Sequence, residues 1–230
     1  MTARDSQRRR RARWGIGLLS LSLGLGLVTL VRAESIASFS VDVVVTAQGD
    51  VAVNETIVYD FGTDNRHGIF REVLPEHTQP ASAWYKERYI RLRPVAVTRN
   101  GDPEPYVNET NEGLFLRIGD PDRTITGEHT YEITYIAEGA LSEVDGITEL
   151  DWNVTGTWPV PLADVDVTLT ANAPAALGSQ GACYAGAPGV TTPCDEFSFH
   201  DSLRSPQARF FESSLAAGEE LTIAQAVTLP

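Results

Sequence analysis

Lysine is nearly missing from this chain of 230 residues, in which Lys86 stands alone beside 17 arginines. Basic residues become scarcer still after residue 33, because seven of the arginines lie before that point. Since residues 1–33 hold only one of the 31 acidic residues, residues 34–230 carry 11 basic and 30 acidic side chains, a net charge of −19. Nucleic acids and anionic lipid surfaces are bound through basic footprints. The composition therefore excludes nucleic acid as a partner. The simplest role of the negative charge is to keep the domain in solution.

The common catalytic signatures are also absent. The sequence has no Gly-x-Ser-x-Gly, His-Glu-x-x-His or phosphate-binding loop, so nucleophilic, zinc-protease and nucleotide chemistry lack support. Its four histidines are scattered, without the spacing of a metal site. We therefore predict no catalytic residue, no metal ligand and no cofactor.

Acidic residues near turns leave two alternatives open. Asp120, Asp122 and Glu128 surround one turn, while Asp164 and Asp166 project from one face of an expected strand, and calcium takes such oxygen ligands. Paired carboxylates also serve glycosidases. However, turn formation and a solvated strand face explain the same residues, and 30 acidic side chains form many pairs by chance.

Only two cysteines occur, Cys183 and Cys194, both in a stretch rich in glycine and proline. They lack the C-x-x-C spacing of redox and metal pairs, and no histidine lies close to them in sequence. We predict a disulfide between them, which requires an oxidising compartment.

One long hydrophobic run is present, from Trp14 to Val31, directly behind a cluster of arginines. A basic segment, an apolar segment and a small residue before the cut are typical of an export signal, with cleavage between Ala33 and Glu34. The uncharged run is also long enough to remain as a helical membrane anchor. In both cases residues 1–33 form a signal peptide or signal anchor, and residues 34–230 form one exported domain, either secreted or held at the cell surface.

Apolar and polar residues alternate through much of the exported domain, a pattern typical of half-buried β-strands. A hairpin is expected from residues 36–46 and 51–61, around a turn containing Gly49. The other expected strands are 88–98, 114–118, 129–137, 147–154, 165–170, 196–199, 208–212 and 221–228, separated by turn signals such as Asn100-Gly101. These ten strands predict an all-β, antiparallel β-sandwich, Ig-like in general architecture. Residues 64–86, with a short helical turn at 81–86, and residues 172–195 are predicted to be long loops.

Six segments together resemble the N-terminal domain of a bacterial family of predicted membrane proteins, domain of unknown function 2207. They are FSVDVVV (39–45), ETIVYDF (55–61), HGIFR (67–71), IGD (118–120), GEHTY (127–131) and WNVTG (152–156). The resemblance implies an extracytoplasmic β-rich domain behind a signal peptide, normally followed by transmembrane helices, and it implies no known reaction. No segment up to Pro230 is long and apolar enough for such a helix, so the leader is the only anchor we expect.

Four residues are candidates for binding. Arg71 could form a fork onto a carboxylate or phosphate, or it could pair with an acidic side chain and hold its loop down. Trp84 and Tyr85 lie in the expected loop 64–86 and are candidate contact residues. Trp158 could stack on a ligand or pack in the core, whereas Trp152, within a strand, is predicted to be core.

These residues predict a noncatalytic extracytoplasmic module that contacts an envelope component or a membrane protein. Membrane contact of its own is expected only through an uncleaved leader. The alternative is a domain that binds or processes envelope glycans, because aromatic and carboxylate side chains lie near the expected loops.

Overall fold

The computed structural model describes residues 33–73, 90–110, 113–144, 146–202 and 206–230, and these contain fifteen strands and no helix. The all-β prediction is confirmed. Residues 1–32 of the predicted leader, the helical turn predicted at 81–86, Trp84 and Tyr85 lie outside the described residues. Within the described part of the chain, no helix is long and apolar enough to cross a membrane.

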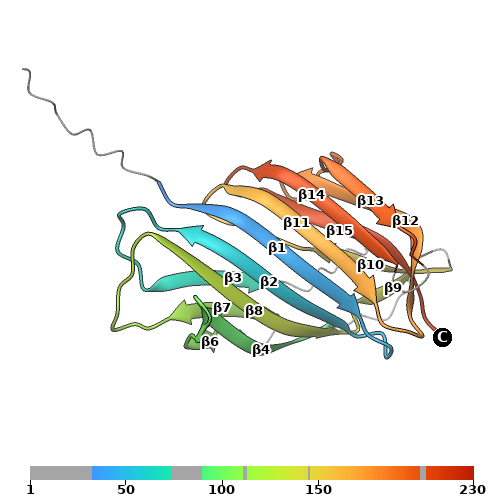
Figure 1. Cartoon of the computed structure of the whole chain (residues 1–230), viewed down its shortest axis with the longest axis horizontal. Coiled ribbons are helices and arrows are strands. Elements are labelled where there is room, and N and C mark those ends of the chain that lie inside the picture. Colours follow the sequence, from blue (N-terminus) through green and yellow to red (C-terminus); the bar gives the residue numbers. More distant parts are fainter. Residues whose placement is uncertain (1–32, 74–89, 111–112, 145, 203–205) are drawn as a thin grey trace, which may run out of the picture. The chain divides into compact units, whose positions relative to one another are not determined.

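The strands form three sheets (Figure 1). Eight strands form the largest sheet, in the order β13-β14-β11-β1-β2-β8-β4-β5, four form the order β12-β15-β10-β9, and three form the order β3-β7-β6. Their bounds are β1 Ser35–Val45, β2 Val51–Asp60, β3 Gly68–Val73, β4 Arg91–Arg99, β5 Asp102–Pro103, β6 Tyr106–Asn108, β7 Leu114–Gly119, β8 Glu128–Glu138, β9 Leu141–Val144, β10 Ile147–Asn153, β11 Leu162–Ala171, β12 Ala176–Gly186, β13 Glu196–His200, β14 Gln207–Leu215 and β15 Glu220–Thr228.

The eight-stranded sheet forms one layer of the domain, and the two smaller sheets lie behind it in Figure 1. Alternate residues of each long strand are buried, as in β2, where Val51, Val53 and Ile57 point inward. These join inward side chains of the smaller sheets, such as Leu116 and Trp152, in one hydrophobic core. The alternation read from the sequence therefore corresponds to a two-layer core.

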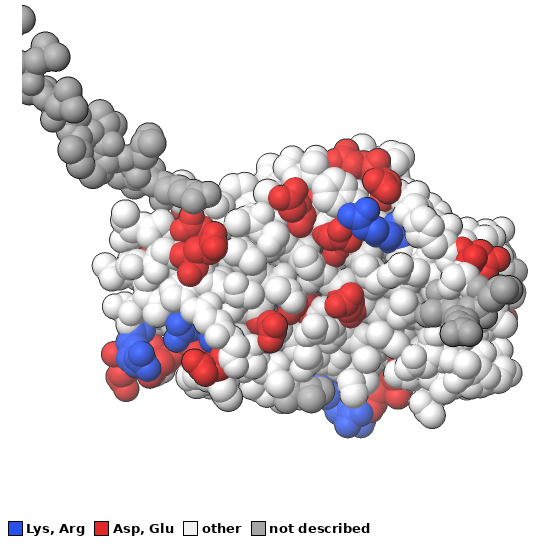
Figure 2. All heavy atoms as spheres, viewed as in Figure 1, with Lys and Arg blue, Asp and Glu red and all other residues white. Residues whose placement is uncertain are grey.

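The opposite face of the eight-stranded sheet is open to solvent. Figure 2 shows scattered acidic groups and few basic ones on a largely uncharged surface. Ser40 and Asp42 on β1 are exposed there, between buried Phe39, Val41 and Val43. The strong net charge of the domain is thus dispersed on this face and forms no single dense patch.

The predicted hairpin is confirmed, since β1 pairs with β2 in antiparallel register. One pairing departs from the predicted antiparallel arrangement: β1 and β11 are parallel neighbours in the middle of the sheet. More than a hundred residues separate these strands along the chain. Alternation shows which face of a strand is buried, but it does not show which distant strand lies beside it, or in which direction.

Both predicted long loops contain strands, which corrects that part of the sequence prediction. Strand β3 lies in the first, and its inward positions are Ile69, Arg71 and Val73. Because one of these is an arginine, the apolar alternation that would have predicted a strand is interrupted. Strand β12 lies in the second and is composed largely of alanine and glycine, which have low strand propensity. The short strands β5, β6 and β9 were also missed.

The predicted disulfide is present between Cys183 on β12 and Cys194, which directly precedes β13. The backbone N–H of Cys194 also donates to the carbonyl oxygen of Cys183, at 3.1 Å. Because β12 belongs to the four-stranded sheet and β13 to the eight-stranded sheet, the bond ties the two layers together at this end of the domain.

Three tyrosines are buried in the core: Tyr59, Tyr131 and Tyr135 are each at most 5% exposed. Burial, which disfavours the charged phenolate, is the largest cause that raises the pKa of all three. The nearby carboxylate of Glu34 raises the pKa of Tyr59 further.

We predict that the domain loses stability as the pH rises above about 10, the ordinary pKa of tyrosine. Below that pH these phenols are protonated in both the folded and the unfolded chain. Above it, the unfolded chain loses protons that the folded chain keeps, so unfolding becomes more favourable. In an alkaline titration, part of the tyrosinate absorbance should appear together with the loss of the β-sheet circular dichroism signal.

The control is the same chain in denaturant, where all seven tyrosines should ionise near their ordinary pKa. Ionisation of every tyrosine at that ordinary pKa in a chain that keeps its folded spectrum would contradict the prediction.

Candidate functional site

The most concentrated polar constellation lies around Arg71, inside the domain. Strand β3 points this side chain inward, and it is only 1% exposed. The partner carboxylate belongs to Glu55 on β2, which is fully buried. A charge in the protein interior is tolerated only when it is paired and hydrogen-bonded, so every donor of this guanidinium needs a partner.

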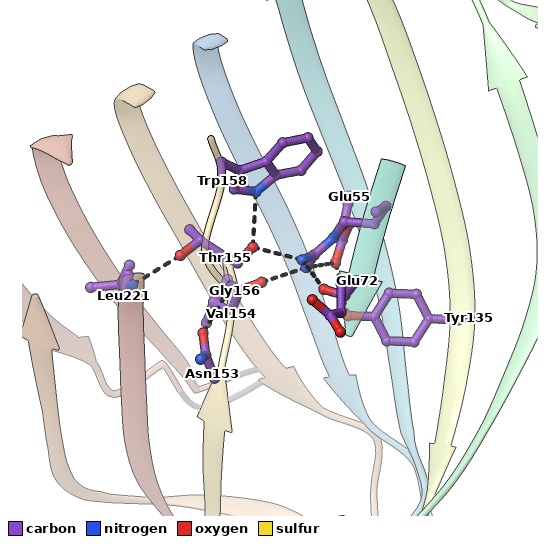
Figure 3. A network of polar contacts seen from close by, with 10 residues as sticks. Glu55, Glu72, Tyr135, Asn153, Val154, Thr155, Gly156, Trp158 and Leu221 are labelled. Atoms are coloured by element: carbon purple, nitrogen blue, oxygen red, sulfur yellow. Dashed lines mark hydrogen bonds and ion pairs between the residues drawn. The ribbon is translucent and has the colours of Figure 1, made fainter. Parts of the chain in front are cut away.

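All five N–H groups of Arg71 have an acceptor (Figure 3). Nε and Nη2 donate to the two oxygens of Glu55, at 2.7 and 2.6 Å, in a bidentate pair. Nη2 also donates to the carbonyl oxygen of Val154, and Nη1 donates to those of Thr155 and Glu72, at 2.6 to 2.7 Å. The guanidinium therefore has no free donor for a ligand.

Tyr135 on β8 completes the polar arrangement. Its hydroxyl donates to Glu55 Oε1 at 2.8 Å, so this carboxylate receives hydrogen bonds from two side chains. Burial lowers the pKa of Arg71, but the charge and hydrogen bonds of Glu55 raise it by more, and the net pKa lies above its ordinary value. Arg71 is therefore a fixed cation that does not titrate.

Aromatic rings enclose the pair. The guanidinium carbon of Arg71 lies 5.5 Å from the ring centre of Phe39 and 5.9 Å from that of Trp158. At these distances the rings attract the cation as well as exclude water. We use the name Arg71 cluster for Glu55, Arg71, Tyr135, Thr155 and Trp158.

The cluster joins all three sheets. Arg71 comes from the three-stranded sheet, Glu55 and Tyr135 come from the eight-stranded sheet, and Thr155 follows β10 of the four-stranded sheet. The turn that carries Thr155 is itself fixed, because its Oγ1 accepts the N–H of Leu221 at 2.9 Å. The arrangement thus holds the sheets in position, and its five side chains are buried, none more than 4% exposed.

Two glycines of the resemblance segments meet beside this cluster. Gly68 at the start of β3 pairs with Gly119 at the end of β7. A Cβ on Gly68 would lie 1.9 Å from the carbonyl oxygen of Ile118, and one on Gly119 would lie 1.9 Å from that of His67. No side chain fits either position, so both residues are glycine for steric reasons.

The remaining segments also contribute to the framework. FSVDVVV supplies Phe39, ETIVYDF supplies Glu55, and WNVTG supplies Thr155. GEHTY closes the end of the β2–β8 ladder, where the Phe61 N–H donates to Gly127 O at 2.9 Å. Segments scattered over more than a hundred residues therefore serve one structural purpose.

The predicted binding residues have different positions in the structure. Arg71 takes the ion-pair alternative, with Glu55 as its acidic partner. Trp158 is buried, and its indole N–H donates to Thr155 O at 3.0 Å, while Trp152 is buried as predicted. Trp84 and Tyr85 lie outside the described residues.

The carboxylates considered for calcium form local contacts. Asp120 Oδ1 accepts the N–H of Asp122 at 2.9 Å, as in an Asx turn, and Asp166 forms an ion pair with Arg209. Among the described residues, no group of three or more His, Cys, Asp or Glu side chains is placed to hold a metal ion.

A shallow groove of about 470 Å³ lies beside the disulfide, and sequence reasoning did not find it. Its polar lining includes Asp195, Glu212 and Glu219. Each accepts a backbone N–H, from Ser213, Asp195 and Ala216 respectively. Hydrogen bonding from Ser213 lowers the pKa of Asp195, whereas burial raises the pKa of Glu212. The bond of Glu219 closes a turn, and the bonds of Asp195 and Glu212 join the start of the β13 segment to β14, which is sufficient to explain the carboxylates.

Sequence reasoning also missed Glu55 and the role of Thr155. Glu55 occupies an inward position in an otherwise apolar alternation, between Val53 and Ile57. A charged residue at a core position of a strand signals a buried partner of opposite charge. That signal could have pointed to Arg71.

We predict that Glu55→Gln destabilises the domain by about 3–5 kcal/mol, because it leaves the Arg71 charge buried without its counter-ion. The measurement is denaturant unfolding followed by circular dichroism. The matched control is Glu109→Gln, which breaks the exposed Arg117–Glu109 pair (2.7 Å) and should cost no more than about 1 kcal/mol.

The double variant Glu55→Gln/Arg71→Met should lose less unfolding free energy than the two single variants lose in sum, because it removes the unpaired charge as well. Equal small losses for Glu55→Gln and Glu109→Gln would show that the buried pair does not hold the sheets together.

Gly68→Ala should lower the free energy of unfolding by about 3 kcal/mol or more, because the new methyl group forces β3 and β7 apart. Gly101→Ala is the control: its φ is +84°, but a Cβ there would meet nothing within 4 Å, so only backbone strain of about 1–2 kcal/mol applies. Thermal unfolding of both variants tests this. Similar losses would refute the steric explanation.

Solved structures to which this chain is similar include M1 zinc metallopeptidases and a hydrolase. The enzyme from Deinococcus radiodurans has 11% identity and a TM-score of 0.48, with 84% of this chain and 42% of that chain covered. A two-domain M1 zinc metallopeptidase mutant bound to L-arginine has 12% identity and a TM-score of 0.50, with the same coverage. Leukotriene A4 hydrolase from Saccharomyces cerevisiae has 11% identity and a TM-score of 0.48, covering 84% and 29%.

This chain therefore spans less than half the length of these proteins. At 12% identity, the likeness shows a shared fold and carries no activity to this chain. No curated protein matches the sequence.

A family model matches nearly the whole β domain, over residues 35–223. The matched region starts at the first residue of β1 and includes all six resemblance segments and the Arg71 cluster. The chain belongs to the family described as predicted membrane protein (DUF2207), N-terminal domain.

Proposed function

We propose that this domain is a noncatalytic recognition module that faces the outside of the cytoplasmic membrane and contacts a protein or another component of the envelope. The observation that carries the proposal is that the Arg71 cluster is buried and that its donors are bound within the protein. The strongest polar groups of the domain are sealed in the core, and all five donors of Arg71 are bound by the protein itself. Enzymes place charged and hydrogen-bonding side chains of this kind in a cleft, whereas here they join the sheets.

Two features support the external location. The disulfide between Cys183 and Cys194 is of a kind that persists in oxidising compartments. The leader, with its arginines ahead of an uncharged run, is typical of export. Family membership adds an association with membrane proteins.

The glycan-binding alternative has less support. Trp158, one of the aromatic residues on which it rested, is buried and hydrogen-bonded to Thr155. Trp84 and Tyr85 remain candidate contacts. Within the described residues, the side chains available for recognition are those exposed on the outer faces of the sheets.

Site-specific photocrosslinking in a bacterial host tests the proposal. A photoreactive amino acid is placed on each sheet, at Ser40 on the eight-stranded, Val144 on the four-stranded and Val107 on the three-stranded sheet, all of which are exposed. We expect at least one position to give a discrete crosslinked species in the envelope fraction, and the purified domain to turn over no peptide or glycan substrate.

Intact mass is the matched control, because a chain that starts at Glu34 and lacks two hydrogens shows that an exported, oxidised domain was probed. The buried position Val41 should give no crosslink to another molecule. Absence of a crosslink at all three exposed positions, or turnover of a peptide or glycan substrate by the purified domain, would overturn the proposal.

A further inference from the structure

We propose that the outer face of the three-stranded sheet is the contact surface of this module, and that its partner is a protein segment that combines apolar with basic side chains. This inference rests on the proposed function and names the surface and the chemistry of the partner. We call the surface the β3-β7-β6 face and define it by Phe70, Glu72, Val107, Glu109, Phe115 and Arg117.

The strand register places these side chains in two rows. Phe70 and Val107 both pair with Arg117, which forms the row Phe70-Arg117-Val107. In the next row Glu72 pairs with Phe115, and the Glu109 N–H donates to Phe115 O at 2.9 Å. Alternate residues of a strand project to one face, so all of these point away from the core.

An aromatic pair lies across two neighbouring strands of the face, β3 and β7. The rings of Phe70 and Phe115 are stacked, with centroids 5.8 Å apart. Phe70 is 54% exposed and Val107 is 49% exposed, the two largest values among the exposed large hydrophobic residues of the described chain. Phe70 stacks on Phe115, and Val107 lies in the same row as Phe70 on the other side of Arg117. Exposed apolar side chains accompanied by polar residues mark interaction sites.

The charged residues of the face determine which partner it fits. Arg117, the only basic residue in the two rows, already forms an ion pair with Glu109 at 2.7 Å. Glu72 is exposed and forms no ion pair with any described residue. The face thus combines three apolar side chains with two glutamates, of which only Glu109 is paired with Arg117, and this is complementary to apolar side chains accompanied by lysine or arginine.

The same charges disfavour other occupants. A second copy of the domain would bring a second net charge of −19 towards the first, and like charges across an interface suppress association. An anionic membrane surface is repelled in the same way. A protein segment with apolar and basic side chains can contact both the exposed aromatic residues and the glutamates of this face.

Binding of short synthetic peptides to the purified domain, measured by fluorescence anisotropy, tests the inference. One peptide alternates lysine with leucine, a second alternates glutamate with leucine, and a third alternates lysine with serine. We expect the lysine-leucine peptide to bind most tightly and the glutamate-leucine peptide not to bind. Phe70→Ser should weaken the lysine-leucine complex about tenfold, as expected for the loss of a central aromatic contact.

Val144→Ser is the matched control, because Val144 is 42% exposed but lies on the four-stranded sheet. This variant should bind the lysine-leucine peptide as tightly as the unmodified chain does. Glu72→Gln should weaken binding by about two- to threefold and reduce its salt dependence. Circular dichroism and thermal unfolding should show that Phe70→Ser folds, as expected for an exposed side chain.

Equal affinity of Phe70→Ser and the unmodified chain for the lysine-leucine peptide would overturn the inference, and so would tight binding of the glutamate-leucine peptide. The crosslinking experiment separates the two proposals. Crosslinks at Ser40 or Val144 but not at Val107 leave the recognition function standing and remove this surface. Absence of crosslinks at all three positions removes the function itself.

Discussion

The paired charges of Arg71 and Glu55 are the constraint on which the rest of the structure depends. An unpaired guanidinium in the core would cost several kcal/mol, so its position is acceptable only while Glu55 and the carbonyl oxygens of Val154, Thr155 and Glu72 surround it. Those acceptors come from all three sheets or from the turns that follow them. A shift of any sheet would leave donors unsatisfied, so the polar network specifies one relative placement where apolar packing alone would tolerate several.

This constraint explains what the sequence segments shared with the family have in common. Phe39 covers the pair, Gly68 and Gly119 let two strands approach closely, and Thr155 supplies an acceptor. Such residues resemble a functional signature when they are read along the chain, because they are polar, aromatic or glycine at unusual positions. In three dimensions they form an internal framework. The framework also places other side chains on the outer faces, and Phe70, directly before Arg71 on β3, is one of them.

Much of the fold could be predicted from alternation. The β1–β2 hairpin, the strands beginning near Leu114, Ile147 and Leu221, and the disulfide follow from local pattern and composition. The prediction failed where a strand carries residues that alternation does not recognise, namely an inward arginine in β3 and an alanine- and glycine-rich run in β12. The candidate site could be predicted only in part. Arg71 was a candidate, and an ion pair with an acidic side chain was one of its two alternatives, but the sequence did not show which acidic residue is its partner.

The sequence alone determined that the described chain is all β, that two cysteines join, and that residues 34–230 are strongly acidic, because composition and residue periodicity carry that information locally. Only the tertiary structure decided that β1 lies parallel to β11, that Glu55 is the residue opposite Arg71, and that Trp158 faces inward while Phe70 faces solvent. These are pairings between residues far apart along the chain. They are decided by the free energy of burying charges and rings together, which no local pattern records.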